Sequence, residues 1–368
     1  MANVKITALP AAASVTSDDI LPMVDIGTTT TQKVTLAQIL ALGASPTGSA
    51  GGDLTGSTYP NPIVSSFGGK IHWVVEGGKY ATLQAAFDAA VEGDTIMVGP
   101  KATGTWGDLV ITENKTMSYV GLNGVNGKQV KIGAITFSPT TGGLNIIRNE
   151  HFFTNLMVSG SFASQAVLFS GTGAGRMRFA GCFINNTSTT GDGVVNSNSY
   201  TSGGTTSSLW LDDTVVLVTT TSGAAIRQSG QYTFVKNRCD ISGGASAVVL
   251  TAGTFESVGA SIEMNGTGSV ISVAATLPTV ASCLLGYSTV RNTTTNGSGV
   301  TLTGNGAALS AGDAAFVVAT GTGYCVRGTG TFLYAQNTFS NSAAAAYNVK
   351  VQNTVTALPV TTTFTSSP

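Results

Sequence analysis

Three short stretches of the chain decide its fold. They are Lys236-Asn-Arg-Cys-Asp-Ile241, Gly259-Ala-Ser-Ile-Glu-Met264 and Tyr287-Ser-Thr-Val-Arg-Asn292. Each is a short run bounded by Gly, Asn, Ser or Thr, and its side chains alternate in the manner of a strand with one buried face. Aligned on their fourth residues, the runs place Cys239, Ile262 and Val290 in one inward column.

The same pattern recurs along the chain. Successive fourth residues are spaced by 33, 24, 23, 28, 26 and 23 residues. A second, offset set of runs shares this period, and strands and tight turns repeating at such a spacing are typical of a parallel β-solenoid. The other runs of the first set are centred on Cys182, Val215, Phe316 and Phe339; those of the second begin at Gln165, Asp192, Ala224, Ser246, Gly268, Gly297, Gly323 and Ala346.

One helix is expected before this array, over residues 82–91. Thr82 is placed to cap its start and Gly93 to stop it. Because the helix precedes the strands, we expect it to cover the open end of the solenoid. Its apolar residues recur at helical spacing, namely Leu83, Ala86, Phe87 and Ala90.

The composition narrows the class of protein. Charged residues make up 10% of the 368 residues, against about 25% in a typical globular protein. The net charge of −1 argues against a nucleic acid or an anionic membrane surface as partner. The apolar share of 42% excludes a disordered chain, and no apolar run is long enough to predict a membrane helix. The first residues do not form a secretory signal, so we expect assembly in a cytoplasm.

The cysteines and histidines give no sign of a metal or cofactor site. The cysteines lie 57, 44 and 42 residues apart without a CxxC pair, and we expect four free thiols. Neither His72 nor His151 has a carboxylate or serine at a motif spacing, so both are expected to be structural. The cysteines are Cys182, Cys239, Cys283 and Cys325.

Composition divides the chain into four parts. Residues 1–43 form a small adaptor with an expected helix over 34–42, and residues 44–68 are a linker rich in Gly, Pro, Ser and Thr. Residues 69–348 hold the solenoid, and residues 349–368 form a C-terminal tail.

Several stretches of the sequence resemble motifs of known protein families. Residues 80–100 resemble the opening of pectate-lyase-like right-handed β-helices, where a capping helix precedes the first coil. Two N-terminal stretches and the linker are similar to segments of bacteriophage tail fibres and tailspikes, including those of cyanophages. These are Val4-Lys-Ile-Thr-Ala-Leu-Pro10, Asp18-Asp-Ile-Leu-Pro-Met-Val-Asp25 with the following residues 30–39, and Gly51-Gly-Asp-Leu-Thr-Gly-Ser-Thr-Tyr-Pro-Asn-Pro-Ile-Val64.

The resemblance implies a homotrimer in the virion tail, docked through its N-terminal segment to a tail or baseplate protein. The β-helix would contact a polysaccharide of the host cell surface. Two alternatives stay open. One is a tailspike depolymerase, a glycosidase or lyase that cleaves the polysaccharide, and the other is a purely structural tail or baseplate component.

The strongest candidates for chemistry are two carboxylates. Aligning Cys239 with Ile262 stacks Asp240 and Glu263 on adjacent rungs, both pointing outward, about 4.8 Å apart. Such a pair is able to supply the acid and base of glycoside cleavage. Alternatively, the column continues to Arg291, which would offset the repulsion in an exposed ladder of charges or hydrogen-bond a glycan.

Two tryptophans, Trp106 and Trp210, are candidates for stacking on sugar rings, or for burial between subunits. The scarcity of charge also predicts exposed apolar stripes of the kind that subunits cover. On the alignment above, Phe183, Val216 and Val317 point outward and fit such a contact.

Overall fold

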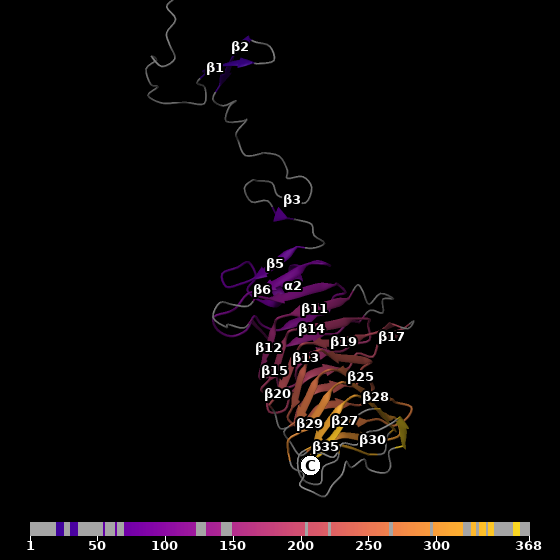
Figure 1. The fold of residues 1–368 in the computed structure, drawn as a ribbon. Helices are drawn as coiled ribbons and strands as arrows, with labels where there is room; N and C mark the ends of the chain where they lie inside the picture. Colours follow the sequence, from indigo (N-terminus) through magenta and orange to yellow (C-terminus); the bar gives the residue numbers. More distant parts are fainter. Residues whose placement is uncertain are drawn as a thin grey trace, which may run out of the picture. The chain divides into compact units, whose positions relative to one another are not determined.

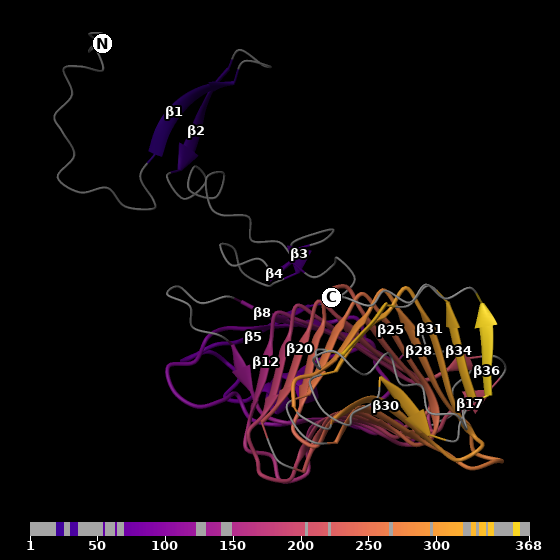
Figure 2. The same cartoon turned by 60° about the horizontal axis from the view of Figure 1, so that its bottom comes forward.

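Three strands, separated by bends, make up one coil of the chain. In the computed structural model, β14 (Arg176–Ala180), β15 (Phe183–Asn186) and β16 (Asp192–Asn196) follow one another, and each pairs in parallel with its equivalent in the coils before and after. Stacking of such coils builds a parallel β-solenoid (Figures 1 and 2). The structure describes residues 20–25, 30–35, 54–55, 63–64, 70–122, 130–140, 149–202, 205–219, 222–264, 268–294, 297–318, 325–328, 331–335, 338–341 and 356–360.

The solenoid consists of three sheets. The twelve-stranded sheet contains β5 (Ile71–Val74), β6 (Thr95–Val98), β8 (Met117–Gly121), β11 (Glu150–Thr154), β14, β19 (Ser208–Asp212), β22 (Tyr232–Lys236), β25 (Gly253–Val258), β28 (Ala281–Gly286), β31 (Ala307–Gly312), β34 (Thr331–Ala335) and β36 (Thr356–Val360). The last of these lies within the stretch expected to be a tail.

Each of the other two sheets has nine strands. The first nine-stranded sheet contains β7 (Leu109–Ile111), β10 (Ile135–Phe137), β13 (Gln165–Phe169), β16, β21 (Ala224–Gln228), β24 (Ser246–Leu250), β27 (Ser269–Ala274), β30 (Ser298–Thr303) and β33 (Val326–Gly328). The second contains β9 (Lys131–Ile132), β12 (Met157–Gly160), β15, β20 (Val215–Val218), β23 (Asp240–Gly243), β26 (Ser261–Met264), β29 (Thr289–Asn292), β32 (Ala315–Val318) and β35 (Thr338–Asn341).

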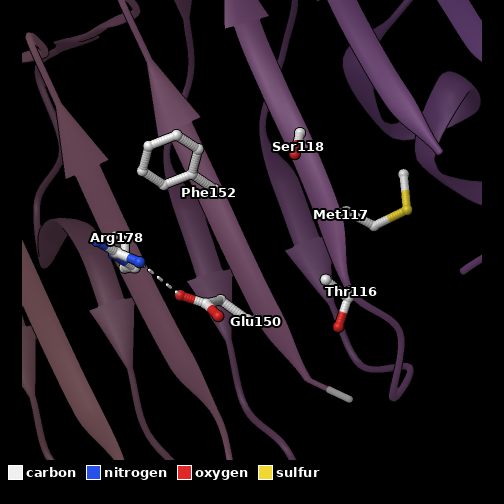
Figure 3. A pocket seen from close by; sticks show the side chains of 6 residues that line it. All are labelled: Thr116, Met117, Ser118, Glu150, Phe152 and Arg178. Carbon is white, nitrogen blue, oxygen red and sulfur yellow. Dashed lines mark hydrogen bonds and ion pairs between the residues drawn. The ribbon is translucent and has the colours of Figure 1, made fainter. Parts of the chain in front are cut away.

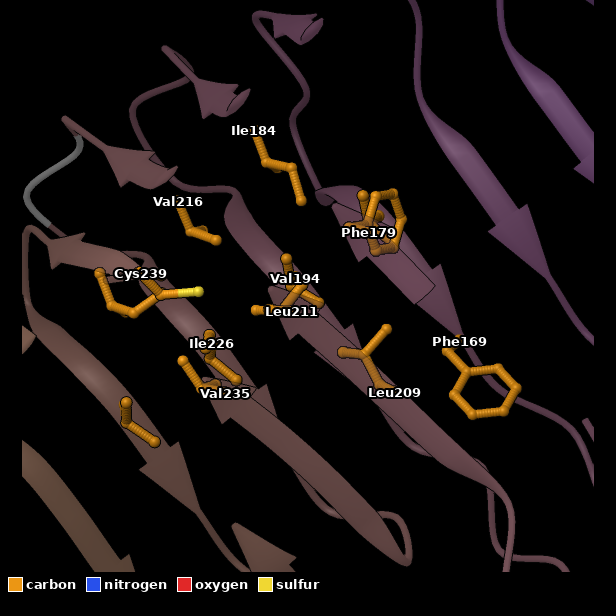
Figure 4. Packing of buried hydrophobic residues seen from close by; sticks show 14 of the residues in the cluster. Phe169, Phe179, Ile184, Val194, Leu209, Leu211, Val216, Ile226, Val235 and Cys239 are labelled. Atoms are coloured by element: carbon orange, nitrogen blue, oxygen red, sulfur yellow. The ribbon is translucent and has the colours of Figure 1, made fainter. Parts of the chain in front are cut away.

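The core consists of columns of inward side chains that run from coil to coil. Tyr119, Phe153 and Phe179 stack with ring centres 4.5 and 4.8 Å apart. Figure 4 shows aliphatic side chains such as Ile184, Val194 and Leu209 filling the interior between the three sheets. Each such fully buried side chain stabilises the fold by about 1.5–3 kcal/mol. Burial of these columns therefore stabilises the fold although the chain has few charged residues.

From β11 to β31, a bend with at least one left-handed residue joins each strand of the twelve-stranded sheet to the next strand of the second nine-stranded sheet. Asn, Asp and Gly adopt this conformation most readily, and they occupy most of these bends. One bend carries two such residues, Asn237 and Arg238, and is therefore one residue longer than the others. The remaining bends have Asn155, Gly181, Asp213, Gly259, Tyr287 and Asp313, with φ between 46° and 72°.

These bends correct the predicted register of the first set of runs. Ile262, Val290, Phe316 and Phe339 do share one column, but Ile241 and not Cys239 lies beside Ile262. The alignment is two residues out at Cys182 and Cys239 and one residue out at Val215, because it does not count from the left-handed residue. The shift of one residue changes the face of the sheet, so Val216, expected to point outward, is fully buried in the core.

The predicted helix is present but shorter than expected. α2 (Leu83–Ala89) begins after Thr82, whose side chain accepts a hydrogen bond from the Ala85 N–H at 3.1 Å. The Lys115 ammonium donates to the carbonyls of Phe87 and Ala90 at 2.8 and 3.0 Å, where the helix ends. The helix ends before Gly93 because the backbone of Ala90 is extended, and Lys115 satisfies carbonyls at this end.

The chain divides into two compact units, Met1–Phe67 and Gly68–Pro368. The first unit contains an antiparallel pair, β1 (Ile20–Asp25) and β2 (Thr30–Thr35), and a short pair, β3 (Leu54–Thr55) and β4 (Ile63–Val64). Residues 34 and 35, the first two of the helix expected over 34–42, belong to β2; residues 36–42 of that prediction lie outside the described residues. A two-stranded antiparallel pair, β17 (Thr201–Ser202) and β18 (Thr205–Thr206), projects from the second unit.

All four cysteines are free and buried. Cys182 and Cys239 lie two rungs apart, and Thr214, not the aligned Val215, lies between them: the Cys182 N–H donates to the Thr214 hydroxyl, and the Thr214 N–H to the Cys239 sulfur. Cys283 lies within β28 and points inward. No helix in the described residues is both long and apolar enough to cross a membrane.

Candidate functional site: an aromatic and cationic surface

Outward aromatic side chains gather on the twelve-stranded sheet. On those strands of the two nine-stranded sheets whose side chains the structure describes, Phe183 is the one aromatic residue that is not buried. The middle of the twelve-stranded sheet instead presents four partly buried aromatic side chains among paired charges. We call this surface the Trp210 face; its outward positions are Glu150, Phe152, Arg176, Arg178, Ser208, Trp210, Asp212, Tyr232, Phe234, Lys236 and Glu256.

One outward column crosses the whole face. Strand pairing places its members on successive rungs in a fixed order, and rungs are about 4.8 Å apart. From Phe152 to Phe234, neighbouring side chains in the column contact one another. The order is Ser118, Phe152, Arg178, Trp210, Phe234 and Glu256.

Arg178 is held between two aromatic rings. Its guanidinium carbon lies 5.4 Å from the centre of the Phe152 ring and 4.9 Å from the centre of the Trp210 ring. The Arg178 Nη1 also donates to Glu150 Oε1 at 3.3 Å. Two cation–π contacts and an ion pair fix a side chain that would otherwise be flexible.

A second arginine supports the same tryptophan. The Arg176 guanidinium carbon lies 5.1 Å from the Trp210 ring centre, and its Nε donates to the Ser208 hydroxyl at 3.1 Å. The indole N–H of Trp210 donates to that hydroxyl at 3.0 Å. Phe234 meets Trp210 edge-on, with ring centres 5.4 Å apart. Trp210 is thus fixed in position from several directions.

The remaining charges on the face are also paired. Lys236 Nζ lies 3.0 Å from Asp212 Oδ2, and the Tyr232 hydroxyl donates to Glu256. Partial burial and the bond to Glu256 raise the pKa of Tyr232, so this hydroxyl stays protonated and acts as a donor. The Trp210 face carries three basic and three acidic side chains, each with a partner.

A hollow opens at one end of the face. It has a volume of about 240 Å³ and is lined by Thr116, Met117, Ser118, Glu150, Phe152 and Arg178. Figure 3 shows Glu150 and Phe152 projecting from one strand, with Arg178 on the next strand joined to Glu150. An aromatic ring, a carboxylate, a guanidinium and hydroxyl groups therefore surround one small space.

No protein-family model, curated protein or solved structure matches the chain. Its function is therefore inferred from this surface and from the sequence motifs.

The structure separates the two predicted catalytic carboxylates. Asp240 lies beside Ser261, while Glu263 lies beside Ser242, so the two are not stacked on one column. The corrected register of the bend at Asn237 and Arg238 is the reason. Partial shielding from water raises the pKa of Asp240, and the charge of Glu263 adds to the rise.

Glu263 and Arg291 do lie beside each other, as predicted. Their closest charged atoms are 3.7 Å apart, and both side chains are well exposed. The Ser261 hydroxyl donates to Glu263 at 3.1 Å. These residues are on the second nine-stranded sheet, away from the strands that carry Trp210.

The two candidate tryptophans differ in accessibility. Trp106 is 3% exposed, and its indole N–H donates to the Gly99 carbonyl at 2.7 Å within the same chain. It is therefore excluded as an exposed platform for sugars. Trp210 is partly exposed and lies at the centre of the face described above.

Sequence reasoning missed the partners of both histidines. His72 Nε2 lies 2.8 Å from Asp94 Oδ2 and its Nδ1 lies 2.8 Å from the Tyr80 hydroxyl, which ties the first rung to the segments before and after α2. The pKa of Asp94 is lowered: bonds from the Val91 N–H, His72 and the Lys70 N–H outweigh the opposing effect of burial. Within the described residues, no three His, Cys, Asp or Glu side chains are grouped to hold a metal ion.

His151 is fully buried and contacts Tyr119 through Nδ1 at 3.2 Å. Its Nε2 has no hydrogen-bond partner. Burial, with a smaller contribution from the charge of Lys115, lowers its pKa to about 3. The imidazole is therefore neutral in the core.

Proposed function

We propose that the chain is a virion tail fibre or tailspike that binds a host surface polysaccharide through the Trp210 face. The observation that carries the proposal is the outward column in which Phe152, Arg178, Trp210 and Phe234 follow one another on a rigid sheet. Sugar rings present apolar C–H faces and hydroxyl edges, so their sites combine aromatic side chains with a few fixed polar groups.

The geometry of the solenoid favours a polymer as ligand. Outward side chains recur about every 4.8 Å along the axis, and the four steps from Phe152 to Glu256 span about 19 Å. A linear polysaccharide lying along the axis would meet several of these positions at once. Because each is already held by a neighbour, little side-chain entropy is lost on binding.

The assignment to a virion rests on the N-terminal motifs and the linker. We propose that residues 1–43 dock to a tail or baseplate protein, that the solenoid coils to the right as parallel crossovers almost always do, and that α2 caps its first coil. The partly buried apolar side chains Met157, Phe183 and Val215 on the second nine-stranded sheet favour a homotrimer. Assembly would occur in the host cytoplasm, and the protein would act at the host cell surface.

A second candidate function is depolymerisation of the polysaccharide. It is favoured by the raised pKa of Asp240, to which the charge of Glu263 contributes, because this places two carboxylates within electrostatic reach of each other. In this scheme Asp240 is the acid and Glu263, held by Arg291, is the base. The third reading, a structural spacer in the tail or baseplate, predicts no glycan contact.

The test is retention of envelope polysaccharides purified from a panel of bacteria, cyanobacteria included. We expect one of them to be bound, and Trp210→Ala to weaken that binding by about 30-fold, since truncating a central Trp costs about 2 kcal/mol. Trp73→Ala is the matched control, because Trp73 is 49% exposed at the far edge of the same sheet. Oligosaccharide release that requires Asp240 would make the protein a depolymerase, and no retention from any source would favour the spacer.

A further inference from the structure

We propose that the hollow beside Phe152 is a subsite for a single uncharged hexopyranose ring of the bound glycan. This inference rests on the proposed function and deepens it by naming the class of sugar and the residues that would hold it.

The hollow has room for one sugar ring. Its volume is about 240 Å³, and it is open to solvent on one side, so the other units of a bound polymer would lie outside it. The hollow lies at the end of the Trp210 face, so the rest of a polymer would continue along the column towards Trp210.

The lining matches the two surfaces of a sugar ring. Phe152 offers an aromatic ring, the surface that packs against the C–H face of a pyranose. Around it, Glu150 accepts hydrogen bonds, Arg178 donates them, and the Ser118 hydroxyl does both. A carboxylate beside a guanidinium is suited to adjacent hydroxyl groups, each of which donates one bond and accepts another.

The polar groups are held in place before any ligand arrives. Arg178 is fixed between Phe152 and Trp210, and its contact with Glu150 orients the carboxylate as well. A guanidinium has five N–H groups, and the contact with Glu150 uses one of its nitrogens. The hollow therefore offers donors without the entropic cost of ordering a long side chain.

Charge decides between neutral and acidic sugars. Glu150 is 21% exposed and contributes a negative charge to the wall of the hollow. It lies 3.3 Å from Arg178 and 3.8 Å from Arg176, so a sugar carboxylate would have to compete with Glu150 for the same cations. Repulsion from Glu150 therefore selects against uronic acids.

The experiment measures binding of small probes to the full chain. Methyl glucopyranoside, methyl mannopyranoside and methyl galactopyranoside are titrated by calorimetry and by tryptophan fluorescence, with methyl glucuronide as the acidic probe. We expect at least one neutral probe to bind, methyl glucuronide to bind at least tenfold more weakly, and emission to change because Arg178 contacts the Trp210 ring. Trp210→Phe should abolish this emission change while the heat of binding persists.

Variants then locate the site. Arg178→Lys and Phe152→Leu should each weaken binding of the neutral probe by about tenfold, whereas Arg227→Lys should leave it unchanged. Arg227 is the matched control because it too pairs with a carboxylate, that of Asp192, on another sheet. Phe152→Leu keeps an apolar side chain in the wall, and thermal melting confirms that each variant folds. Glu150→Gln should narrow the preference for neutral over acidic probes.

Three outcomes would overturn the inference: no neutral probe binds, methyl glucuronide binds more tightly than all neutral probes, or Arg178→Lys and Phe152→Leu bind as the wild type does. These outcomes are distinguishable from failure of the proposed function. If the wild type retains an envelope polysaccharide and the two variants retain it equally, the subsite is wrong but the function stands. If no polysaccharide is retained, the function itself fails.

Discussion

The guanidinium of Arg178 stands 4.9 Å from the centre of the Trp210 ring, on the neighbouring rung of the twelve-stranded sheet. Contacts of this kind contribute about 0.5–1 kcal/mol at partly exposed sites. The pair links the hollow at Phe152 to the rest of the Trp210 face, and its loss should affect both stability and fluorescence.

We expect Arg178→Met to lower the free energy of unfolding by about 1 kcal/mol. The substitution keeps the aliphatic bulk but removes the cation from both rings and leaves Glu150 with the more distant Arg176. Urea denaturation followed by tryptophan emission measures the change. Arg238→Met is the control, because the Arg238 side chain is 86% exposed and its substitution should have no measurable effect. An equal loss of stability in both variants would contradict the inference that the contact between Arg178 and Trp210 stabilises the fold.

Stability should fall below neutral pH because of His151. Its pKa is about 3 in the folded chain and 6.5 when unfolded, so between these values the unfolded chain binds more protons. The free energy of unfolding therefore falls by up to about 1.4 kcal/mol per pH unit as the pH drops from 6.5 towards 3. Asp94, whose pKa is lowered by folding, contributes a further loss at lower pH.

His151→Phe tests this assignment. Its neighbours Phe137 and Phe153 already form an aromatic core, so a phenyl ring fits the surroundings. Denaturation curves collected from pH 7 to pH 4 should be flatter in this variant than in the wild type. Identical slopes would show that another group causes the loss.

The thiols should be unreactive in the native protein. Burial raises the pKa of Cys182 and Cys239 to about 11 and that of Cys283 and Cys325 to about 12. At pH 8 the reactive thiolate is therefore scarce and inaccessible. Iodoacetamide should modify none of them until denaturant is added, when four thiols per chain react, and a reductant should leave the melting temperature unchanged.

Two glycines allow the bend geometry to be tested. Gly259 and Gly312 both have open space where a Cβ would be placed, but Gly259 alone of the two has a positive φ, +72°. Gly259→Ala should thus destabilise the protein by about 1–2 kcal/mol from backbone strain. Gly312→Ala should be neutral or slightly stabilising. Equal effects at the two sites would argue against the left-handed bend.

The proposed trimer predicts a mass in solution three times that of the 37.1 kDa chain. Multi-angle light scattering at micromolar concentration measures it. Phe183→Glu should reduce the mass, since it places a charge among the apolar side chains of the second nine-stranded sheet. A monomeric wild type would remove the trimer from the proposal.

The solenoid was predictable because its inward columns repeat. The runs that begin at Gln165, Asp192, Ala224 and Ser246 align as expected. The run that begins at Gly268 is one residue out, since Ile271 and not Val270 lies beside Val248. The other set of runs slipped at Cys182, Val215 and Cys239, where the start of a run was not counted from the left-handed residue. Asn, Asp or Gly at that position was the sequence signal that would have fixed the register.

The Trp210 face could not be found from the sequence for a related reason. Strands such as Arg176–Ala180 and Ser208–Asp212 are followed after a bend of two residues by the next strand. In the sequence, each such pair of strands looks like a single run of residues. The strands of the twelve-stranded sheet are therefore not distinguished from those of the second nine-stranded sheet. Without that sheet, nothing in the sequence brings Phe152, Arg178 and Trp210 together from positions 26 and 32 residues apart.

The longer bend at Asn237 and Arg238 has a consequence for how such a chain can diversify. Although it contains one residue more than its neighbours, the strands on both sides keep their pairing, since Lys236 still lies beside Asp212 and Ile241 beside Val216. Insertions are thus confined to the bend in which they arise. A lineage could lengthen bends and exchange outward side chains one coil at a time, changing the surface it presents while inheriting the same interior.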